Sequence, residues 1–278
     1  AVSAVELLDR RSLRSVQHTA GMPDWIEQLG SSACALLIES RAADNALLEQ
    51  QLQQINASIA HFPKEQHIAF SQDPAVYELL WRMRKDTFPA VGAVRENGTT
   101  VIIEDVTFPL EHLADGVNRL LTLLDEHHYD EAILFGHALE GNLHFVFTQR
   151  FDQPEEVARY SAFMQAVSHL VAVGFGGSLK AEHGTGRNMA PFVELEWGSD
   201  AYQLMWRIKH LLDPQGILNP DVVLSNDAEI HLKNLKPMPE ANPIIDKCIE
   251  CGFCEPVCPA HGLTLSPRQR IVAWRDIQ

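Results

Sequence analysis

The cysteines are the feature that most limits how this chain can fold. Four of the five lie between Cys248 and Cys258, and Cys34 stands alone in an apolar run. A disulfide scaffold spreads its cysteines along the chain, so this distribution excludes one. The fold must therefore depend on a hydrophobic core, which 278 residues with 46% hydrophobic content can supply. Within its apolar run, Cys34 is expected to be a plain buried thiol.

The clustered cysteines have the spacing C-x2-C-x2-C-x3-C-P, which runs without a gap over 248–259. In two-cluster ferredoxins three thiolates of this motif bind one iron–sulfur cluster, and the fourth, next to the proline, binds the other cluster. A zinc site is the alternative, but it normally uses two separated cysteine pairs. The spacing therefore predicts 4Fe-4S ligation, with the fourth cysteine directed to a second cluster, by these residues: Cys248, Cys251, Cys254 and Cys258.

The same motif indicates that the sequence is a piece of a longer protein. A two-cluster domain takes the last ligand of this cluster from a second cysteine motif, and none follows before Gln278. We therefore expect a fragment that does not hold an intact cluster by itself. An iron assay that finds about four irons per chain, the content of one such cluster, would contradict this expectation.

The charge balance excludes one class of function. The formal net charge is -15, whereas a nucleic-acid binder normally shows a basic face. No apolar run reaches the length of a membrane span, and residues 1–20 lack the order of a signal peptide. We expect a cytoplasmic protein without a transmembrane segment, with peripheral attachment to the inner membrane through a partner as the alternative.

Hydrophobic periodicity predicts strands that alternate with helices. Short apolar runs indicate strands, and apolar residues at helical spacing indicate helices. The predicted strands cover 33–39, 67–70, 100–105, 132–135 and 143–147. The predicted helices cover 48–59, 73–84, 113–124, 154–173 and 200–212.

This order of elements indicates the fold class. Strand, helix, strand and helix follow one another twice, which predicts an α+β fold: a ferredoxin-like sandwich of mainly antiparallel sheet with helices on one face. Proline, glycine and polar residues end the pattern near residue 224. We predict a main domain over 1–224, a linker over 225–246 and the start of a helical iron–sulfur domain over 247–278.

Two histidine segments are candidates for a functional site. His137 ends one predicted strand and His144 lies in the next, so a hairpin can bring both to the same end of the sheet. Two neutral imidazoles are a good start for a divalent metal site, and Glu182 can complete the ligand set. His183, beside it, can then act as a general base. Cross-strand packing and capping are the alternatives for the histidines.

Three motifs resemble a known family. Gly-His-x-x-x-Gly-Asn-Leu-His at 136–144, Glu-His-Gly-Thr-Gly-Arg at 182–187 and Leu-Asp-Pro-Gln-Gly-Ile-Leu-Asn-Pro at 212–220 are similar to the C-terminal half of FAD-linked oxidases of the vanillyl-alcohol-oxidase superfamily. Over about 1–224 the chain resembles their D-lactate, glycolate and D-2-hydroxyglutarate dehydrogenases. With the cysteine segment it resembles large bacterial fusion proteins described as D-2-hydroxyglutarate or D-lactate dehydrogenases.

The resemblance implies a substrate or cap domain of ferredoxin-like fold, with the main FAD-binding domain earlier in the chain. It implies a divalent-metal site, commonly zinc, at His137, His144 and Glu182. It also implies that His183 is the catalytic base. Nothing in the sequence resembles the FAD-binding domain itself, so we expect the isolated piece to be inactive.

Further residues take their roles only from the resemblance. Arg84 lies where the family places an arginine for the substrate carboxylate, and Asn142 lies where it touches substrate or flavin. Asn219 lies in the segment that returns toward the flavin. The chain departs from the eukaryotic pattern at 103–105, where Ile-Glu-Asp replaces a lysine-bearing stretch.

The expected function is therefore a flavin-dependent dehydrogenase. It would oxidise a D-2-hydroxy acid, D-2-hydroxyglutarate or D-lactate, to the 2-oxo acid and pass hydride to FAD. Electrons would leave through iron–sulfur clusters to an acceptor protein or quinone. A non-catalytic electron-transfer or docking module is the alternative, while a zinc hydrolase does not account for the cysteine motif.

Overall fold

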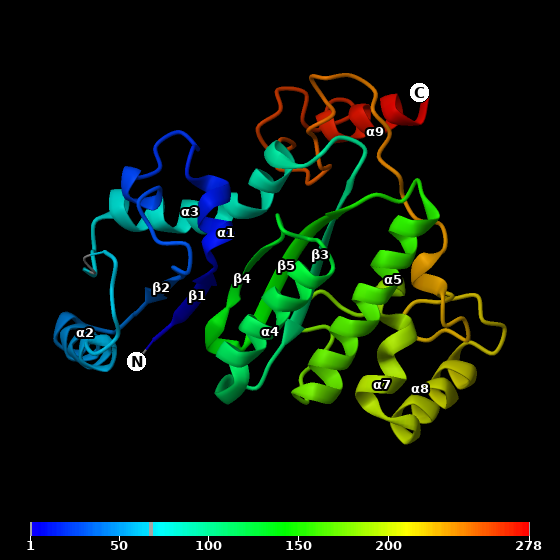
Figure 1. Cartoon of the computed structure of the whole chain (residues 1–278), viewed down its shortest axis with the longest axis horizontal. Helices are drawn as coiled ribbons and strands as arrows, with labels where there is room; N and C mark the ends of the chain where they lie inside the picture. The colour runs from blue at the N-terminus through cyan, green and yellow to red at the C-terminus, as the bar shows by residue number, and fades with distance from the viewer. Residues whose placement is uncertain (1, 67–68, 278) are drawn as a thin grey trace.

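A five-stranded sheet is the centre of the part of the chain that the structure describes. The structure is a computed structural model, and it describes residues 2–66 and 69–277. The strands lie in the order β2-β1-β4-β5-β3, and every neighbouring pair is antiparallel (Figure 1). Their bounds are Ala4–Leu8 for β1, Ala35–Glu39 for β2, Thr100–Thr107 for β3, Ile133–His137 for β4 and Asn142–Gln149 for β5.

The second half of the sheet has the ferredoxin-like connectivity. Strand β5 lies between β3 and β4, so β3 and β4 run parallel to each other and α4 (Leu113–Glu126) is the crossover between them. After α5 (Pro154–Ser168) the chain returns to the edge of β3, where Thr107 and Ser178 form an antiparallel bridge. The α+β class with a mainly antiparallel sheet is therefore confirmed.

Helices cover both faces of this sheet, whereas the sequence pattern predicted one face. On the first face α4 and α5 pack against inward-facing residues such as Leu134 and Phe145. On the second face α1 (Arg10–Val16) and α3 (Pro74–Val94) pack against Phe135 and Val146. Successive strand residues point to opposite faces, so the apolar runs in β4 and β5 are buried on both sides.

The remaining helices lie around this centre. Helix α2 (Asn45–Ile59) follows the edge strand β2, and a π-helix, His169–Gly174, continues α5. The others are α6 (Gly186–Met189), α7 (Val193–Trp197), α8 (Ser199–Leu212) and α9 (Pro267–Ile277). Short 3-10 turns cover Asp24–Ile26, Leu110–His112, Ala138–Glu140, Ala190–Phe192 and Ile230–Leu232. No helix in the described ranges is long and apolar enough to cross a membrane.

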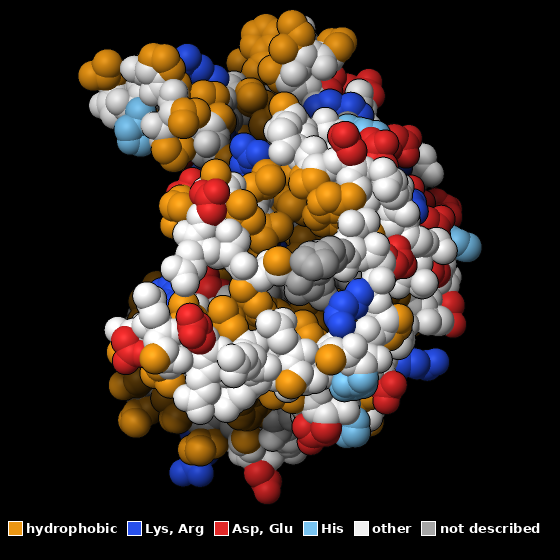
Figure 2. All heavy atoms as spheres, turned by 90° about the vertical axis from the view of Figure 1, so that its left-hand side faces the viewer, with side chains coloured by type: hydrophobic (Ala, Val, Ile, Leu, Met, Phe, Trp, Pro, Cys, Tyr) orange, Lys and Arg blue, Asp and Glu red, His pale blue; other side chains and the backbone are white. Residues whose placement is uncertain are grey.

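Several predicted boundaries differ from the structure. Strand β1 and helix α1 were not predicted, and α3 continues ten residues beyond Arg84, to Val94, with Pro89 inside it. The strand predicted over 67–70 falls partly on residues 67–68, outside the described residues, and no strand is assigned at 69–70. Cys34 is exposed rather than buried, because it lies just before β2, at the edge of the sheet. This side of the molecule, which carries α2 and β2, exposes other hydrophobic side chains (Figure 2).

The largest effect on stability is expected from a substitution in the core that packs on the first face of the sheet. Phe145 is completely buried and its ring lies near those of Phe147 and Phe163. Replacing Phe145 by Ala should lower the free energy of unfolding by about 3–5 kcal/mol, since it leaves a cavity that neighbours cannot fill. Urea denaturation followed by circular dichroism measures this. Phe62→Ala, at an exposed ring, is the control and should change it by about 0.5 kcal/mol or less.

Candidate functional site

The hairpin between β4 and β5 places two histidines at one end of the sheet. Phe135 pairs with His144 and His137 pairs with Asn142 across the two strands. These four side chains share the face that α3 covers, and the two imidazole centroids are 5.3 Å apart. The turn needs glycine at Gly141, because φ there is +70° and a Cβ would lie 2.2 Å from the Phe108 carbonyl oxygen.

A buried aspartate in β3 holds the next segment of the site. Asp105 is 0% exposed and lies opposite His144 in the register of β3 and β5. Its Oδ2 accepts hydrogen bonds from the backbone N–H of Glu182 (2.6 Å) and of His183 (3.1 Å). Asp105 therefore fixes the loop that carries both residues against the end of the sheet.

Three imidazoles surround one carboxylate oxygen. The Oε1 atom of Glu182 lies 3.1 Å from Nε2 of His144, 3.4 Å from Nε2 of His137 and 3.7 Å from Nε2 of His183. The ligand atoms of His137, His144 and Glu182 all lie within 4.8 Å of one another, close enough to hold one metal ion. The set Asp105, His144 and His183 meets the same distance limit. The structure thus brings together the four residues that the sequence singled out here.

A buried glutamate supports this cluster from behind. Oε1 of Glu6, in β1, accepts a hydrogen bond from Nδ1 of His137 at 2.7 Å, and its Oε2 accepts one from Nε of Arg84 at 2.8 Å. With its proton on Nδ1, His137 presents the lone pair of Nε2 to the cluster. The Arg84 guanidinium also lies 4.4 Å above the ring of Phe135. Glu6 therefore joins Arg84 to the histidine cluster.

Burial controls the charge of the central histidine. Burial, and then the electrostatic effect of the neighbouring His183, lower the pKa of His144 to about 4. His144 is therefore neutral at pH 7 and has a free lone pair. Within the described part of the chain its Nδ1 is buried without a hydrogen-bond partner, as is Oδ1 of Asn142. Unpaired buried polar atoms at this point indicate a site shaped for a further group.

Two acidic residues beside the cluster, Glu104 and Asp105, lie close to the ammonium group of Lys180. Burial raises the pKa of Glu104, although the ion pair with Lys180 opposes the rise. Burial alone would also raise the pKa of Asp105, but hydrogen bonds from the backbone of Glu182 and His183, together with the charge of Lys180, hold it below its ordinary value. The Lys180 ammonium lies 3.5 Å from Oδ1 of Asp105. The sequence departure at 103–105 thus places two carboxylates beside a lysine from another segment.

The other predicted residues lie outside the histidine cluster. Asn219 is exposed in the loop after α8, with φ of +42°, and none of the described contacts joins it to the cluster. The loop then approaches the glycine-rich segment, because the backbone N–H of Val223 donates to the Gly186 carbonyl at 3.3 Å. The four motif cysteines form no disulfide and lie together in the segment that precedes α9.

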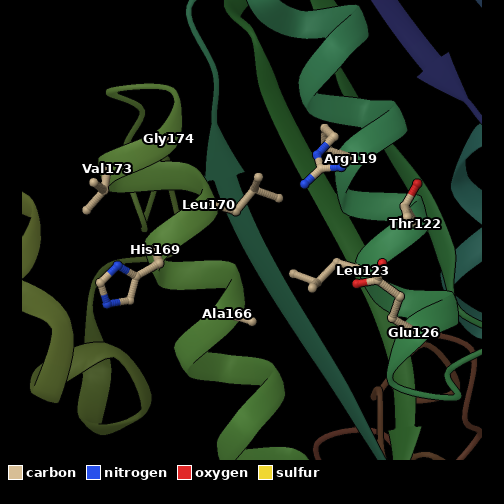
Figure 3. A pocket seen from close by; sticks show the side chains of 9 residues that line it. All are labelled: Arg119, Thr122, Leu123, Glu126, Ala166, His169, Leu170, Val173 and Gly174. Carbon is tan, nitrogen blue, oxygen red and sulfur yellow. The ribbon is translucent and has the colours of Figure 1, made fainter.

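A separate hollow lies on the opposite face of the sheet. It has a volume of about 380 Å³ between α4 and the end of α5, with Leu123, Ala166 and Leu170 at its apolar part and Arg119 and Glu126 at its rim (Figure 3). Because α4 and α5 cover the first face and α3 covers the second, this hollow is not part of the histidine cluster.

Two residues of the cluster's support were not found from the sequence. Glu6 lies in the short run Ala-Val-Glu-Leu-Leu, and its role depends on His137, which is 131 positions away. Asp105 did have a signal, because it and Glu104 are two acidic residues inside a largely apolar strand. A charged pair inside a buried strand indicates partners elsewhere in the fold.

The chain matches two known family models. Residues 1–223 match the family model of FAD linked oxidases, C-terminal domain, and residues 243–264 match that of the 4Fe-4S binding domain. The mitochondrial D-lactate dehydrogenase [cytochrome] of Arabidopsis thaliana is 32% identical over 79% of this chain and 37% of its own length. The glycolate oxidase subunit GlcD of Bacillus subtilis is 27% identical over 81% of this chain and 46% of its own length.

A third relative is the probable mitochondrial D-2-hydroxyglutarate dehydrogenase of Oryza sativa subsp. indica, which is 27% identical over 80% of this chain and 38% of its own length. The chain thus spans less than half the length of each of these three curated relatives. The family match covers most of the chain and includes the histidine cluster. The chain belongs to the family of FAD linked oxidases, as their C-terminal domain, and carries a 4Fe-4S binding motif behind it.

Proposed function

We propose that this chain is the substrate-side part of a flavin-dependent dehydrogenase that oxidises a D-2-hydroxy acid to the 2-oxo acid. The observation that carries the proposal is the convergence of three imidazole Nε2 atoms on the Glu182 carboxylate, next to the partly buried Arg84. D-Lactate, glycolate and D-2-hydroxyglutarate, which the names of the relatives mention, are the substrates to test first.

A divalent metal fits the donor set of His137, His144 and Glu182. Two neutral imidazoles and one carboxylate leave coordination positions open, which is typical of catalytic zinc sites. The Glu6 hydrogen bond to Nδ1 of His137 is the kind of support that metal-bound histidines receive. When bound, the metal would polarise the 2-hydroxyl group of the substrate and lower its pKa. We propose zinc as the first candidate.

His183 is proposed as the general base. Its Nδ1 faces Oδ1 of Asp105 at 3.4 Å, and Asp105 also holds the backbone N–H of the same residue. This arrangement keeps the proton on Nδ1 and leaves Nε2 free to take the hydroxyl proton of the substrate. The side chain is 38% exposed, so a small molecule can reach it.

Arg84 is proposed to bind the substrate carboxylate. Glu6 occupies only Nε, so the two terminal NH2 groups can form a bidentate pair with a carboxylate, a geometry that lysine cannot match. The unpaired Oδ1 of Asn142 is proposed to accept a hydrogen bond from substrate or flavin. Asn219 is proposed to lie on the flavin side. FAD would accept the hydride from C2 of the substrate.

The cysteine segment is proposed to carry electrons away one at a time. Cys248, Cys251, Cys254 and Cys258 would bind 4Fe-4S clusters, and an acceptor protein or quinone would take the electrons. We also propose the division into a substrate domain over 1–224, a linker over 225–246 and an iron–sulfur segment over 247–278. A non-catalytic electron-transfer or docking module is the second candidate, since the cysteine motif suits it equally.

Turnover by the full-length holoenzyme decides between the two. The protein, loaded with flavin, should reduce an artificial dye when given D-lactate, D-2-hydroxyglutarate or the achiral glycolate, and should be inactive with L-lactate and L-2-hydroxyglutarate. The same substrates, assayed with enzyme that has been dialysed against a chelator, test whether activity needs a bound metal. Stable flavin binding with no turnover of any 2-hydroxy acid would instead support the docking module.

The hydrogen bond between His137 and Glu6 predicts that metal affinity falls when this bond is removed. Replacing Glu6 by Gln removes the carboxylate that orients His137, so zinc affinity should fall about 10- to 100-fold. Competition with a coloured zinc chelator measures this. Glu78→Gln, at an exposed position on α3, is the control and should leave the affinity unchanged. Equal affinities in both variants would show that Glu6 serves only packing.

A further inference from the structure

The cysteine segment packs against the far end of the helix that carries Arg84. Gly92, in the last turn of α3, has no room for a side chain, because a Cβ would lie 2.8 Å from Cγ2 of Ile249 and 2.9 Å from the Lys247 carbonyl oxygen. The ring of Phe253 meets that of Phe88, one turn earlier. The loop of the motif therefore lies directly on α3, as the position of α9 and its preceding loops shows (Figure 1).

Two buried arginines hold this loop. Arg95, which follows α3, is 3% exposed, and Arg275, in α9, is 5% exposed. Their guanidinium groups donate to the same carbonyl oxygen, that of Cys248, at 3.2 Å and 2.9 Å. Arg95 also donates to the Asp246 carbonyl, and Arg275 donates to the Ile245 carbonyl at 3.1 Å. Two cations thus meet at the first cysteine of the motif.

The acidic groups nearby do not balance these charges. Glu250 accepts a hydrogen bond from Arg275 at 2.8 Å, but its other oxygen is paired with Lys236. The Asp246 carboxylate accepts from the backbone N–H of Ala241 and Asn242 and from no arginine. Arg275 thus has a carboxylate partner, whereas Arg95 donates to carbonyl oxygens and forms no ion pair among the described contacts. A buried cation of this kind is costly, so the arrangement calls for a further anion beside Cys248.

A cluster bound by the thiolates of Cys248, Cys251 and Cys254 would supply that anion. A cluster bound through cysteine thiolates has a net negative charge, and one-electron reduction adds one more negative charge without adding an atom. Nearby cations stabilise the reduced form more than the oxidised form, and hydrogen bonds to sulfur act in the same direction. Here the backbone N–H of Glu250 donates to Sγ of Cys248 at 3.4 Å, in a turn where φ of Glu250 is +62°.

We propose that Arg95 and Arg275 are the counter-charges of the iron–sulfur cluster and raise its reduction potential, while they position the peptide of Cys248. The inference rests on the proposed role of the cysteines as cluster ligands. Arg95 is notable because it lies in the oxidase part of the chain, about 150 residues before the motif, as the sequence separation of its bond to Cys248 shows. The oxidase domain would then contribute to the electron affinity of the cluster.

The test is a redox titration of the cluster in the full-length holoenzyme, with chemical mediators and electron paramagnetic resonance. Arg95→Gln and Arg275→Gln should each shift the potential to more negative values. Arg95→Lys and Arg275→Lys keep the charge and should stay near the wild-type value. Arg268→Gln is the matched control, because this arginine is 43% exposed and paired with Glu255 in the same segment, so its loss should shift the potential little.

Each outcome of this experiment decides the proposal. Unchanged potentials in both glutamine variants with full iron content would overturn it. If the glutamine variants lose iron and the lysine variants retain it, the site needs the charges, which supports the proposal. Loss of iron in the lysine variants as well would show a purely geometric role and overturn it. Because mediators replace substrate, the potential can be read even if the enzyme oxidises no 2-hydroxy acid.

Discussion

Replacement of His183 by Ala in the full-length holoenzyme should lower kcat/KM for its 2-hydroxy acid about 100- to 10,000-fold, the usual contribution of a general base. The imidazole lies between the Glu182 carboxylate and the buried Asp105 and is the most exposed of the three in the cluster, at 38%. Flavin and iron content should stay at wild-type values. Dye reduction under steady-state conditions measures the loss.

His61→Ala, at an exposed histidine on the surface, is the control and should retain full turnover. A second variant, Asp105→Asn, keeps the shape of the aspartate but removes its charge. It should lower kcat more than it raises KM, because the base is then poorly oriented while the substrate still reaches Arg84. Unchanged turnover in His183→Ala would show that another group removes the proton, and would favour the non-catalytic module.

Replacement of His144 by Ala should abolish metal binding and, with it, activity. His144 is the most deeply buried of the three histidines and its Nε2 lies closest to Glu182. Its low pKa, about 4, means that it presents a lone pair across the neutral range without first losing a proton. Metal content per chain, measured by atomic emission after gel filtration, should fall from about one to near zero.

Chelation of the wild-type enzyme should reproduce this loss, and added Zn²⁺ should restore activity to the wild type but not to His144→Ala. The contrary result, full activity in metal-free wild type, would mean that the histidines and Glu182 serve substrate binding alone. His210→Ala, at an exposed histidine in α8, is the matched control and should keep both metal and activity.

The sequence predicted the parts of this site that depend on short-range geometry. His137 and His144 belong to one hairpin, and Glu182 and His183 are neighbours, so local pattern made them candidates, and the family resemblance gave them their expected roles. Glu6 and Asp105 act over 131 and 77 positions, and no periodic signal reports contacts at such separations. The same reason explains why the second helical layer was missed, since apolar runs buried on both faces do not say what covers them.

Helix α3 places a constraint on insertions and deletions. It carries Arg84 at the histidine cluster and Gly92 against the cysteine loop, which are eight residues and about 12 Å apart along the axis. Adding one residue between them would turn one end by about 100° relative to the other and detach either the arginine or the loop. Homologous chains are therefore expected to keep the number of residues in this stretch constant. A shift of the helix at one end should also move the residues that pack against its other end.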